Sequence, residues 1–424
     1  MKKLIYTFIL LLAANRLNAQ DVPGEYAGYL NVQGTKIKLV FHILRNEGKL
    51  TASFDSPDQN AMGLKIDETT LNGNQLYLNA GSLGFAFQGT INQNRDSIDG
   101  SWIQGGGKLP LVLKRVEQKE INKPVNPYET EIVLKTASGD INGTLTLPDP
   151  AVKVPLVLII AGSGAIDRDG NSPPAMKNNS NCYKLMADEL RKNGIASVRY
   201  DKRGIGGSMA AAKKEIDLRF ENYVSDAKDW IDLLVQDKRF SKIIVAGHSE
   251  GSLIGMIACN QSKSNGFISV AGAGRPVAEV LKEQLRSLPP EDTAQIFPML
   301  DKLKKGDTIS NVPSSLYSIL RPSVQPYMIS WFKYDPQVEI KKLTIPVLII
   351  QGDMDIQVSL HDAELLARAN PKAELKIIRY MNHLLKDTDT LDKEEQVEKV
   401  YVNGDLPLDM VFNNEMVKFI RAVK

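Results

Sequence analysis

The spacing of apolar residues divides the chain into two regions with different patterns. From about Gly24 to Val116, short runs alternate apolar and polar residues, as at 36–41 and 109–113, and turn sequences such as Asn72-Gly73-Asn74 separate them. Period-two patterning interrupted by turn residues is typical of strands with one buried face. We therefore expect residues 20–117 to form a small all-β domain of seven or eight strands, either a barrel or a sandwich.

A polar, proline-containing linker at 118–128 precedes the second region, residues 129–424. There, apolar runs alternate with amphipathic segments: the runs lie at 155–161, 195–200, 242–246, 345–351 and 373–379, and the segments near 183–193 and 220–236. Apolar strands joined by helices indicate a mostly parallel, doubly wound α/β sheet covered on both faces.

Two departures from this alternation are expected. Segments 130–134 and 143–147 flank Ser138-Gly139-Asp140 and predict a hairpin ahead of the parallel strands. Between about 274 and 336 the alternation stops, and helical patterns and prolines take its place. We expect this insertion to form a helical cap over the active site.

The first nineteen residues have the layout of a secretory signal peptide. Lys2 and Lys3 precede an uncharged, mostly apolar run at 4–14, and Ala19 offers a small residue at the cleavage point. The alternative is a retained anchor, but the run is too short to cross a bilayer comfortably. We expect export to the periplasm or the medium, with no stable membrane insertion after cleavage.

Composition narrows the function classes. Fifty-two Lys and Arg against fifty Asp and Glu leave a formal charge of +2, which gives no support for nucleic-acid binding. The two cysteines, Cys182 and Cys259, are too few for a disulfide scaffold; we expect Cys259 to be a free core thiol and leave a bridge between the two open. Neither a metal-ligand cluster nor a dinucleotide fingerprint is present, so no cofactor is expected.

The central chemical signal is Gly247-His248-Ser249-Glu250-Gly251, between the expected strand at 242–246 and an apolar segment at 252–259. A Gly-x-Ser-x-Gly sequence in a strand-turn-helix context predicts a nucleophile elbow with Ser249 as nucleophile. The alternative is a glycine-rich turn with a passive serine.

A serine hydroxyl needs a base, and the chain has four histidines. His248 lies inside the elbow, His42 belongs to the β region, and His361 begins a helix, where we expect it at the surface. His383 follows the last expected strand in a loop and is therefore the predicted general base.

The acid that orients this base should lie in the loop after the strand at 345–351. Asp353 and Asp355 compete there, and we favour Asp355 because it lies deeper in the loop. The order Ser249, Asp355, His383 is the one expected for a doubly wound hydrolase.

The oxyanion of the tetrahedral intermediate needs two main-chain donors. We expect them from Glu250, which follows the nucleophile, and from Ser163 in the Ala161-Gly162-Ser163-Gly164 loop, with Gly164 as the nearest alternative.

Three other features have more ordinary interpretations. The loop at 201–208, Asp-Lys-Arg-Gly-Ile-Gly-Gly-Ser, is expected to be pinned by its aspartate and arginine, and Asp167-Arg168-Asp169 to line the pocket mouth or be solvated. Tyr26, Tyr29 and Trp102 could stack on a carbohydrate, although a packing role for the β domain is favoured.

Five segments, taken as an ordered set, resemble those of bacterial α/β-hydrolase carboxylesterases. They are the loops at 161–171 and 201–208, the elbow, Gly352-Asp353-Met354-Asp355 and Asn382-His383. The resemblance covers about 130–424 and is to the subgroup with an extra N-terminal β domain. It implies the α/β-hydrolase fold, a triad of Ser249, Asp355 and His383, and activity on short-chain carboxylic esters. A departure is Ala161, which stands where lipases often have histidine.

The leading hypothesis is a serine carboxylesterase acting on small-molecule esters, with acylated carbohydrates as one class. The alternatives are an aminopeptidase-type enzyme on the same triad, in which Glu250 or an acidic cap residue would bind a peptide terminus, and a non-catalytic binding protein on a hydrolase scaffold.

Overall fold

The structure is a computed structural model that describes residues 22–32, 34–46, 48–56, 61–116, 126–148, 153–173, 176–212, 214–313 and 316–424. The chain divides into two compact units, Met1–Ile121 and Asn122–Lys424. The expected signal peptide at 1–19 and most of the expected linker at 118–128 lie outside the described residues. Among the described residues, no helix is both long and apolar enough to cross a membrane.

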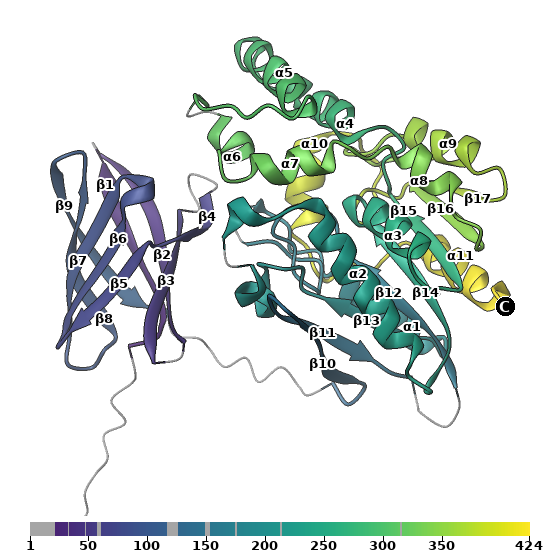
Figure 1. The fold of residues 1–424 in the computed structure, drawn as a ribbon, viewed down its shortest axis with the longest axis horizontal. Helices are drawn as coiled ribbons and strands as arrows, with labels where there is room; N and C mark the ends of the chain where they lie inside the picture. The colour runs from purple at the N-terminus through teal and green to yellow at the C-terminus, as the bar shows by residue number, and fades with distance from the viewer. Residues whose placement is uncertain are drawn as a thin grey trace, which may run out of the picture. The chain divides into compact units, whose positions relative to one another are not determined.

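The described part of the N-terminal unit is one antiparallel sheet of nine strands, in the order β4-β3-β2-β1-β9-β8-β7-β6-β5 (Figure 1). The sequence indicated seven or eight. The strands are β1 (Gly24–Val32), β2 (Thr35–Asn46), β3 (Lys49–Ser56), β4 (Ala61–Lys65), β5 (Glu68–Asn72), β6 (Gln75–Ala80), β7 (Phe85–Ile91), β8 (Ser97–Gln104) and β9 (Gly107–Arg115). Because β3 also contacts β5, the sheet curls round a single core.

Aromatic rings fill that core. Phe54 packs edge-on against Phe85 at 4.7 Å, and Trp102 stacks on Phe85 at 3.8 Å between ring centroids. Tyr26 is fully buried and Trp102 is 5% exposed, whereas Tyr29 is 61% exposed. Tyr26 and Trp102 are therefore core residues and offer no stacking face to a carbohydrate, because both side chains occupy inward positions of their strands.

The second unit contains, in its described residues, a sheet of eight strands in the order β10-β11-β13-β12-β14-β15-β16-β17. The strands are β10 (Glu129–Thr136), β11 (Gly139–Thr146), β12 (Val154–Ile160), β13 (Ala196–Tyr200), β14 (Phe240–His248), β15 (Gly266–Val270), β16 (Val347–Gly352) and β17 (Glu374–Ile378). β10 and β11 form the expected antiparallel hairpin, and the strands from β13 to β17 pair in parallel. The α/β fold class predicted from the sequence is confirmed.

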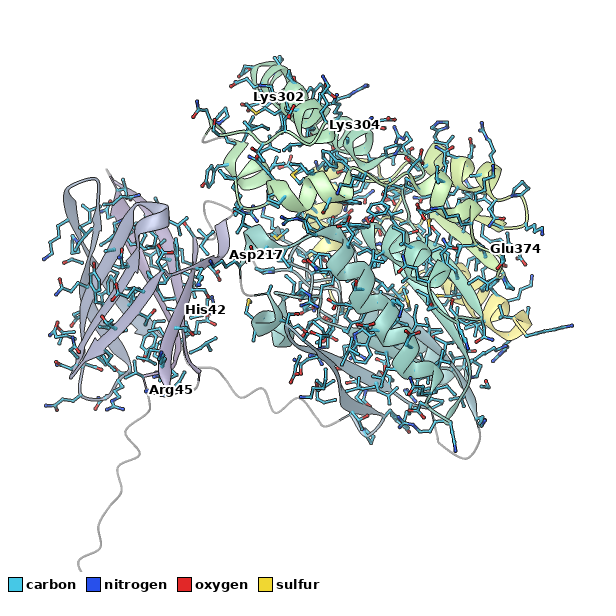
Figure 2. All side chains as sticks on the ribbon, viewed as in Figure 1. His42, Arg45, Asp217, Lys302, Lys304 and Glu374 are labelled. Carbon is cyan, nitrogen blue, oxygen red and sulfur yellow. The ribbon has the colours of Figure 1, made fainter. Side chains whose placement is uncertain are left out.

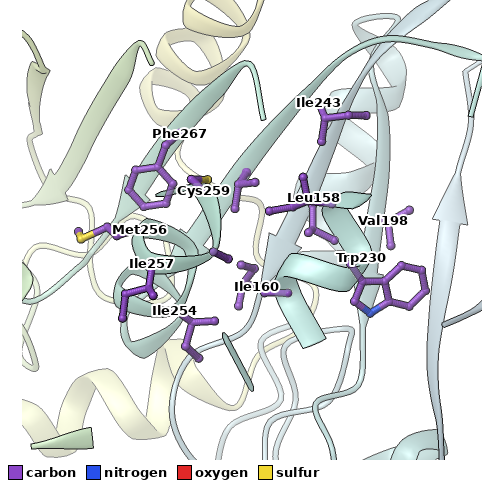
Figure 3. Close-up of a cluster of buried hydrophobic side chains, with 14 of the residues drawn as sticks. Leu158, Ile160, Val198, Trp230, Ile243, Ile254, Met256, Ile257, Cys259 and Phe267 are labelled. Atoms are coloured by element: carbon purple, nitrogen blue, oxygen red, sulfur yellow. The ribbon is translucent and has the colours of Figure 1, made fainter. Parts of the chain in front are cut away.

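Alternate residues of the central strand β12 supply two cores. Leu156, Leu158 and Ile160 face one side, where α2 (Phe220–Val235), α3 (Glu250–Asn260), α8 (Pro336–Lys341) and α9 (Leu360–Ala369) cover the sheet (Figure 3). Val157 and Ile159 face the other side, covered by α1 (Cys182–Lys192) and α11 (Met410–Ala422). Both faces of the parallel strands are therefore apolar, as the uninterrupted runs indicated.

Between β15 and α8 the described residues form four α-helices with a core of their own. They are α4 (Val277–Gln284), α5 (Pro290–Lys304), α6 (Tyr317–Leu320) and α7 (Gln325–Trp331), grouped together in Figure 1. α7 contacts α2, where the ring of Trp331 stacks on Phe220 at 5.8 Å. A last short helix, α10 (Lys393–Gln396), precedes α11. All side chains of the described parts are drawn in Figure 2.

Candidate active site

Ser249 occupies a sharp turn between β14 and α3. Its backbone has φ 53° and ψ −118°, a region that non-glycine residues rarely adopt, and its side chain is partly exposed. The turn requires its glycines, because a Cβ at Gly247 would lie 2.1 Å from the Gly251 carbonyl oxygen, and one at Gly251 would lie 2.3 Å from that of Ile160. The predicted nucleophile therefore lies in a strained strand-to-helix elbow.

His383 and Asp355 meet in loops that follow β17 and β16. The His383 Nδ1 lies 2.8 Å from the Asp355 Oδ2, and the two side chains are 4% and 1% exposed. Asp353, the competing carboxylate, instead accepts the Tyr380 N–H at 2.6 Å. Of the two candidates, Asp355 is thus the one that contacts the histidine.

The Asp355 carboxylate is held in its ionised form. Burial alone would raise the pKa of Asp355, but the positive charge and hydrogen bond of His383 and the N–H groups of Val358 and Gln357 together lower it below its usual value. An ionised acceptor at Nδ1 keeps the proton on that nitrogen, which leaves Nε2 of His383 free to take a proton.

His248, the neighbour of Ser249, is buried in a directional hydrogen-bond chain. Its Nε2 lies 2.8 Å from the His383 carbonyl oxygen, which can only accept, so Nε2–H donates and Nδ1 accepts from the Tyr183 hydroxyl at 2.8 Å. Burial lowers the pKa of His248 to about 3, and the charge of the nearby His383 makes a smaller contribution in the same direction. A neutral imidazole with both nitrogens engaged holds the His383 loop in place and is not a base.

The expected oxyanion loop lies against Ser249. A Cβ on Gly162 would come within 3.2 Å of the Ser249 Cβ, and the Gly162 N–H donates to the Tyr183 hydroxyl at 2.9 Å. The next N–H along the loop is that of Ser163, which is exposed. Glu250 is the first residue of α3, and the first N–H groups of a helix have no partner within it. Both predicted donors are thus main-chain groups near Ser249.

The Glu250 side chain, by contrast, is engaged in an ion pair. Its Oε2 lies 2.7 Å from the Lys202 Nζ, with side chains 2% and 3% exposed, and the Tyr327 hydroxyl of α7 donates to Oε1. Lys202 also donates to the Gly162 carbonyl oxygen at 2.5 Å. Sequence reasoning did not single out Lys202. Their proximity follows from the strand order, because Lys202, Gly162 and Glu250 follow the adjacent strands β13, β12 and β14.

The remaining charged loops are structural. Asp201 accepts from Arg168 at 2.9 Å, and Asp169 accepts from Arg199 at 2.8 Å. Arg203 pairs with Asp226, with Nε 3.0 Å from Oδ2. The loop at 201–208 is pinned as expected, and Arg168 and Asp169 hold segment 167–169 in place through partly buried ion pairs.

The other expected residues have ordinary surroundings. Cys182 and Cys259 lie in described segments and are both buried and free, so the bridge left open by the sequence is not formed. The side chain of His361 is 56% exposed at the start of α9. His42 lies in the N-terminal unit, in strand β2 (Figure 2).

The known proteins to which the chain is similar are hydrolases. A family model described as serine aminopeptidase, S33, matches residues 175–338. Esterase EstD of Thermotoga maritima is 28% identical over 288 residues, which make up 65% of this chain and 65% of the esterase, slightly less than two thirds of its length.

Similar solved structures include Est1E from Butyrivibrio proteoclasticus, at 16% identity and TM-score 0.44 over 69% of this chain and 99% of that one. Another is the Pyrococcus furiosus esterase Pf2001, at 16% identity and TM-score 0.44 over 70% and 91%. Strand order and elbow give the second unit the α/β-hydrolase fold, and the sequence is similar to that of an esterase; the chain carries an additional N-terminal β unit.

Proposed function

We propose that the protein is a serine carboxylesterase that hydrolyses carboxylic esters, with short acyl chains preferred, through an acyl-enzyme intermediate. The observation that carries the proposal is the buried hydrogen bond between His383 and Asp355, beside an elbow that holds Ser249 in a strained conformation. The imidazole rings of His383 and His248 lie 4.7 Å apart, which brings the base next to the nucleophile's neighbour.

In this mechanism Ser249 attacks the ester carbonyl while Nε2 of His383 takes its proton. Asp355 keeps Nδ1 protonated and stabilises the imidazolium, which then protonates the leaving alcohol. The N–H groups of Glu250 and Ser163 stabilise the oxyanion, and the N-terminus of α3 favours negative charge there. Water then repeats the cycle on the acyl-enzyme.

A peptidase on the same triad is the second hypothesis, and it follows from the description of the matching family model. An aminopeptidase needs a free carboxylate to bind the substrate's ammonium group. Glu250 does not supply one, because Lys202 and Tyr327 already bind its two oxygens. This geometry counts against Glu250 in that role, and the peptidase hypothesis then requires an acidic residue of the helical insertion to bind the ammonium group.

The test is hydrolysis of a panel of p-nitrophenyl acyl esters and aminoacyl anilides by wild type and Ser249→Ala. We expect ester turnover that the substitution abolishes, with the fastest rates for short acyl chains. Anilide turnover lost in the same variant would replace the esterase with a peptidase. An inert wild type that also fails to react with a serine-directed phosphonate would favour the non-catalytic binding protein.

We also propose that the enzyme is exported and meets its substrates, acylated carbohydrates among them, in the periplasm or the medium. The proposal rests on the signal-like segment at 1–19. N-terminal sequencing of the protein from a periplasmic fraction should give Gln20 as the first residue. Recovery of an uncleaved chain from the cytoplasm would contradict export.

A further inference from the structure

The ends of three adjacent parallel strands bring Lys202 into contact with both Gly162 and Glu250. Strand β12 lies between β13 and β14, so the loop that holds Gly162 lies between the loops that hold Lys202 and Glu250. The Lys202 Nζ bridges its two neighbours, at 2.5 Å from the Gly162 carbonyl oxygen and 2.7 Å from the Glu250 Oε2. Lys202 is 2% exposed and Glu250 is 5% exposed.

The carbonyl that Lys202 binds belongs to the peptide group that carries the Ser163 N–H. A trans peptide is planar, and its C=O and N–H point in opposite directions. An ammonium group fixed on the oxygen therefore fixes the direction of the N–H on the other side. The same hydrogen bond polarises the peptide and strengthens the N–H as a donor. The Gly162 N–H is held as well, by Tyr183, so the loop is fixed on both sides of this residue.

Lys202 also removes an electrostatic conflict at the site. The Glu250 carboxylate belongs to the residue whose N–H is the other proposed oxyanion donor, and an unpaired buried carboxylate there would oppose a developing negative charge. Its two oxygens are instead bound by Lys202 and by the Tyr327 hydroxyl, which reaches the pair from α7. The Lys202 ammonium further lies 5.1 Å from the centre of the Tyr223 ring, on the α2 side.

We propose that Lys202 is a positioning residue for the oxyanion hole: it aims the Ser163 N–H by binding the Gly162 carbonyl and neutralises Glu250 beside the second donor. Tyr327 extends the same network to the helical insertion. This inference rests on the proposed function, because it assigns a role in stabilising the tetrahedral intermediate that Ser249 forms.

The experiment compares wild type, Lys202→Met, Glu250→Gln and the double variant, with Ser249→Ala as the inactive reference. Asp226→Asn is the matched control, because it alters a buried ion pair with Arg203, the next residue of the same loop, that does not contact Gly162. The readouts are kcat and KM for a short-chain p-nitrophenyl ester, the inhibition constant of a trifluoromethyl ketone, and thermal stability. The ketone forms a tetrahedral oxyanion on the serine and so reports on the two donors.

For Lys202→Met we expect kcat to fall by about 10- to 100-fold with KM changed by less than about threefold, since loss of a whole oxyanion donor costs about 100- to 1,000-fold. The inhibition constant should rise by a similar factor. Glu250→Gln retains the bond from Lys202 to Gly162 and should lose less than about fivefold. The control should lower the melting temperature with kcat within about threefold of wild type.

The double variant separates positioning from stability. It removes both buried charges, so the melting temperature should recover relative to Lys202→Met, while kcat stays low because Gly162 is still unanchored. Recovery of kcat together with stability would overturn the aiming role of the bond from Lys202 to Gly162 and support only the neutralisation of Glu250. Near wild-type kcat in Lys202→Met would overturn both roles. Either result would leave the esterase proposal intact. Wild type without ester turnover, or turnover that survives Ser249→Ala, would overturn the proposed function and this inference with it.

Discussion

Two neighbouring imidazoles, those of His248 and His383, are distinguished by their hydrogen-bond partners. His383 faces the ionised Asp355, which in the proposed mechanism stabilises the imidazolium. His248 faces a hydroxyl and a carbonyl oxygen and is fully enclosed, and burial lowers its pKa to about 3. At the scale of the residue, the difference between the proposed base and its structural neighbour therefore comes from the partner at one ring nitrogen.

The lowered pKa of His248 makes stability depend on pH. Its folded-state pKa of about 3 lies below the unfolded value of 6.5, so between these values the unfolded chain binds a proton that the native protein does not. Stability is therefore lost as pH falls through this window, by roughly 1.4 kcal/mol per pH unit.

His248→Gln, which cannot titrate but can still donate to the His383 carbonyl, should reduce this slope. The measurement is urea unfolding of both proteins at several pH values below neutrality. Parallel curves for the two proteins would contradict the assignment of this acid sensitivity to His248.

Three neighbouring strands of the N-terminal unit build a different histidine site. His42 of β2 is paired in register with Glu25 of β1, and Asp55 of β3 lies diagonally across from it. The His42 Nε2 lies 2.7 Å from the Asp55 Oδ2, and Nδ1 lies 3.6 Å from Glu25. The hydrogen bond to Asp55 raises the pKa of His42. Burial acts against this shift, and the charges of both carboxylates act with it. Cross-strand register thus creates a site with pH dependence opposite in sign to that of His248.

The raised pKa of His42 predicts that the N-terminal unit is more stable in mild acid. The stabilisation is complete below the unfolded value of 6.5 and is lost as pH rises through the raised folded value. The stability difference between wild type and His42→Gln should therefore be larger at about pH 6 than at about pH 9. Thermal unfolding of both proteins at the two pH values measures it, and the shift of the His42 resonance in NMR locates its pKa. An unchanged difference would refute the role of the carboxylate pair.

For the whole molecule, the sequence predicted those strands and helices that the local pattern of apolar and polar residues determines. Strands such as β12 and β13 and helices such as α1 and α2 were expected within one or two residues of their bounds, because uninterrupted apolar runs and amphipathic periods report burial directly. Strand β15, Gly266–Val270, was not expected, because a segment of five residues is too short for its apolar pattern to be distinguished from that of a loop. The residues assigned to the triad came from their places after successive strands, a topological argument.

The missed features depend on contacts between loops. Lys202 and Glu250 are 48 positions apart in the chain, and only the strand order β13-β12-β14 makes them neighbours. Tyr26 and Trp102 were considered as exposed stacking faces because alternation defines two faces of a strand and does not say which one is covered. Such properties depend on tertiary structure that a single sequence does not encode locally.

Separate cores in the two units predict separate unfolding transitions. Phe87 is fully buried among the residues of the N-terminal core, and Ile254 is fully buried in one core of the second unit. Phe87→Ala should destabilise only the first unit by about 3–5 kcal/mol, and Ile254→Ala only the second by about 2–5 kcal/mol. Calorimetry of the full chain should show one transition shifting in each variant, with ester hydrolysis lost at the transition that Ile254→Ala lowers. A single transition lowered by both substitutions would mean that the units unfold together, and loss of activity at the Phe87-sensitive transition would mean that the β unit supports the active site.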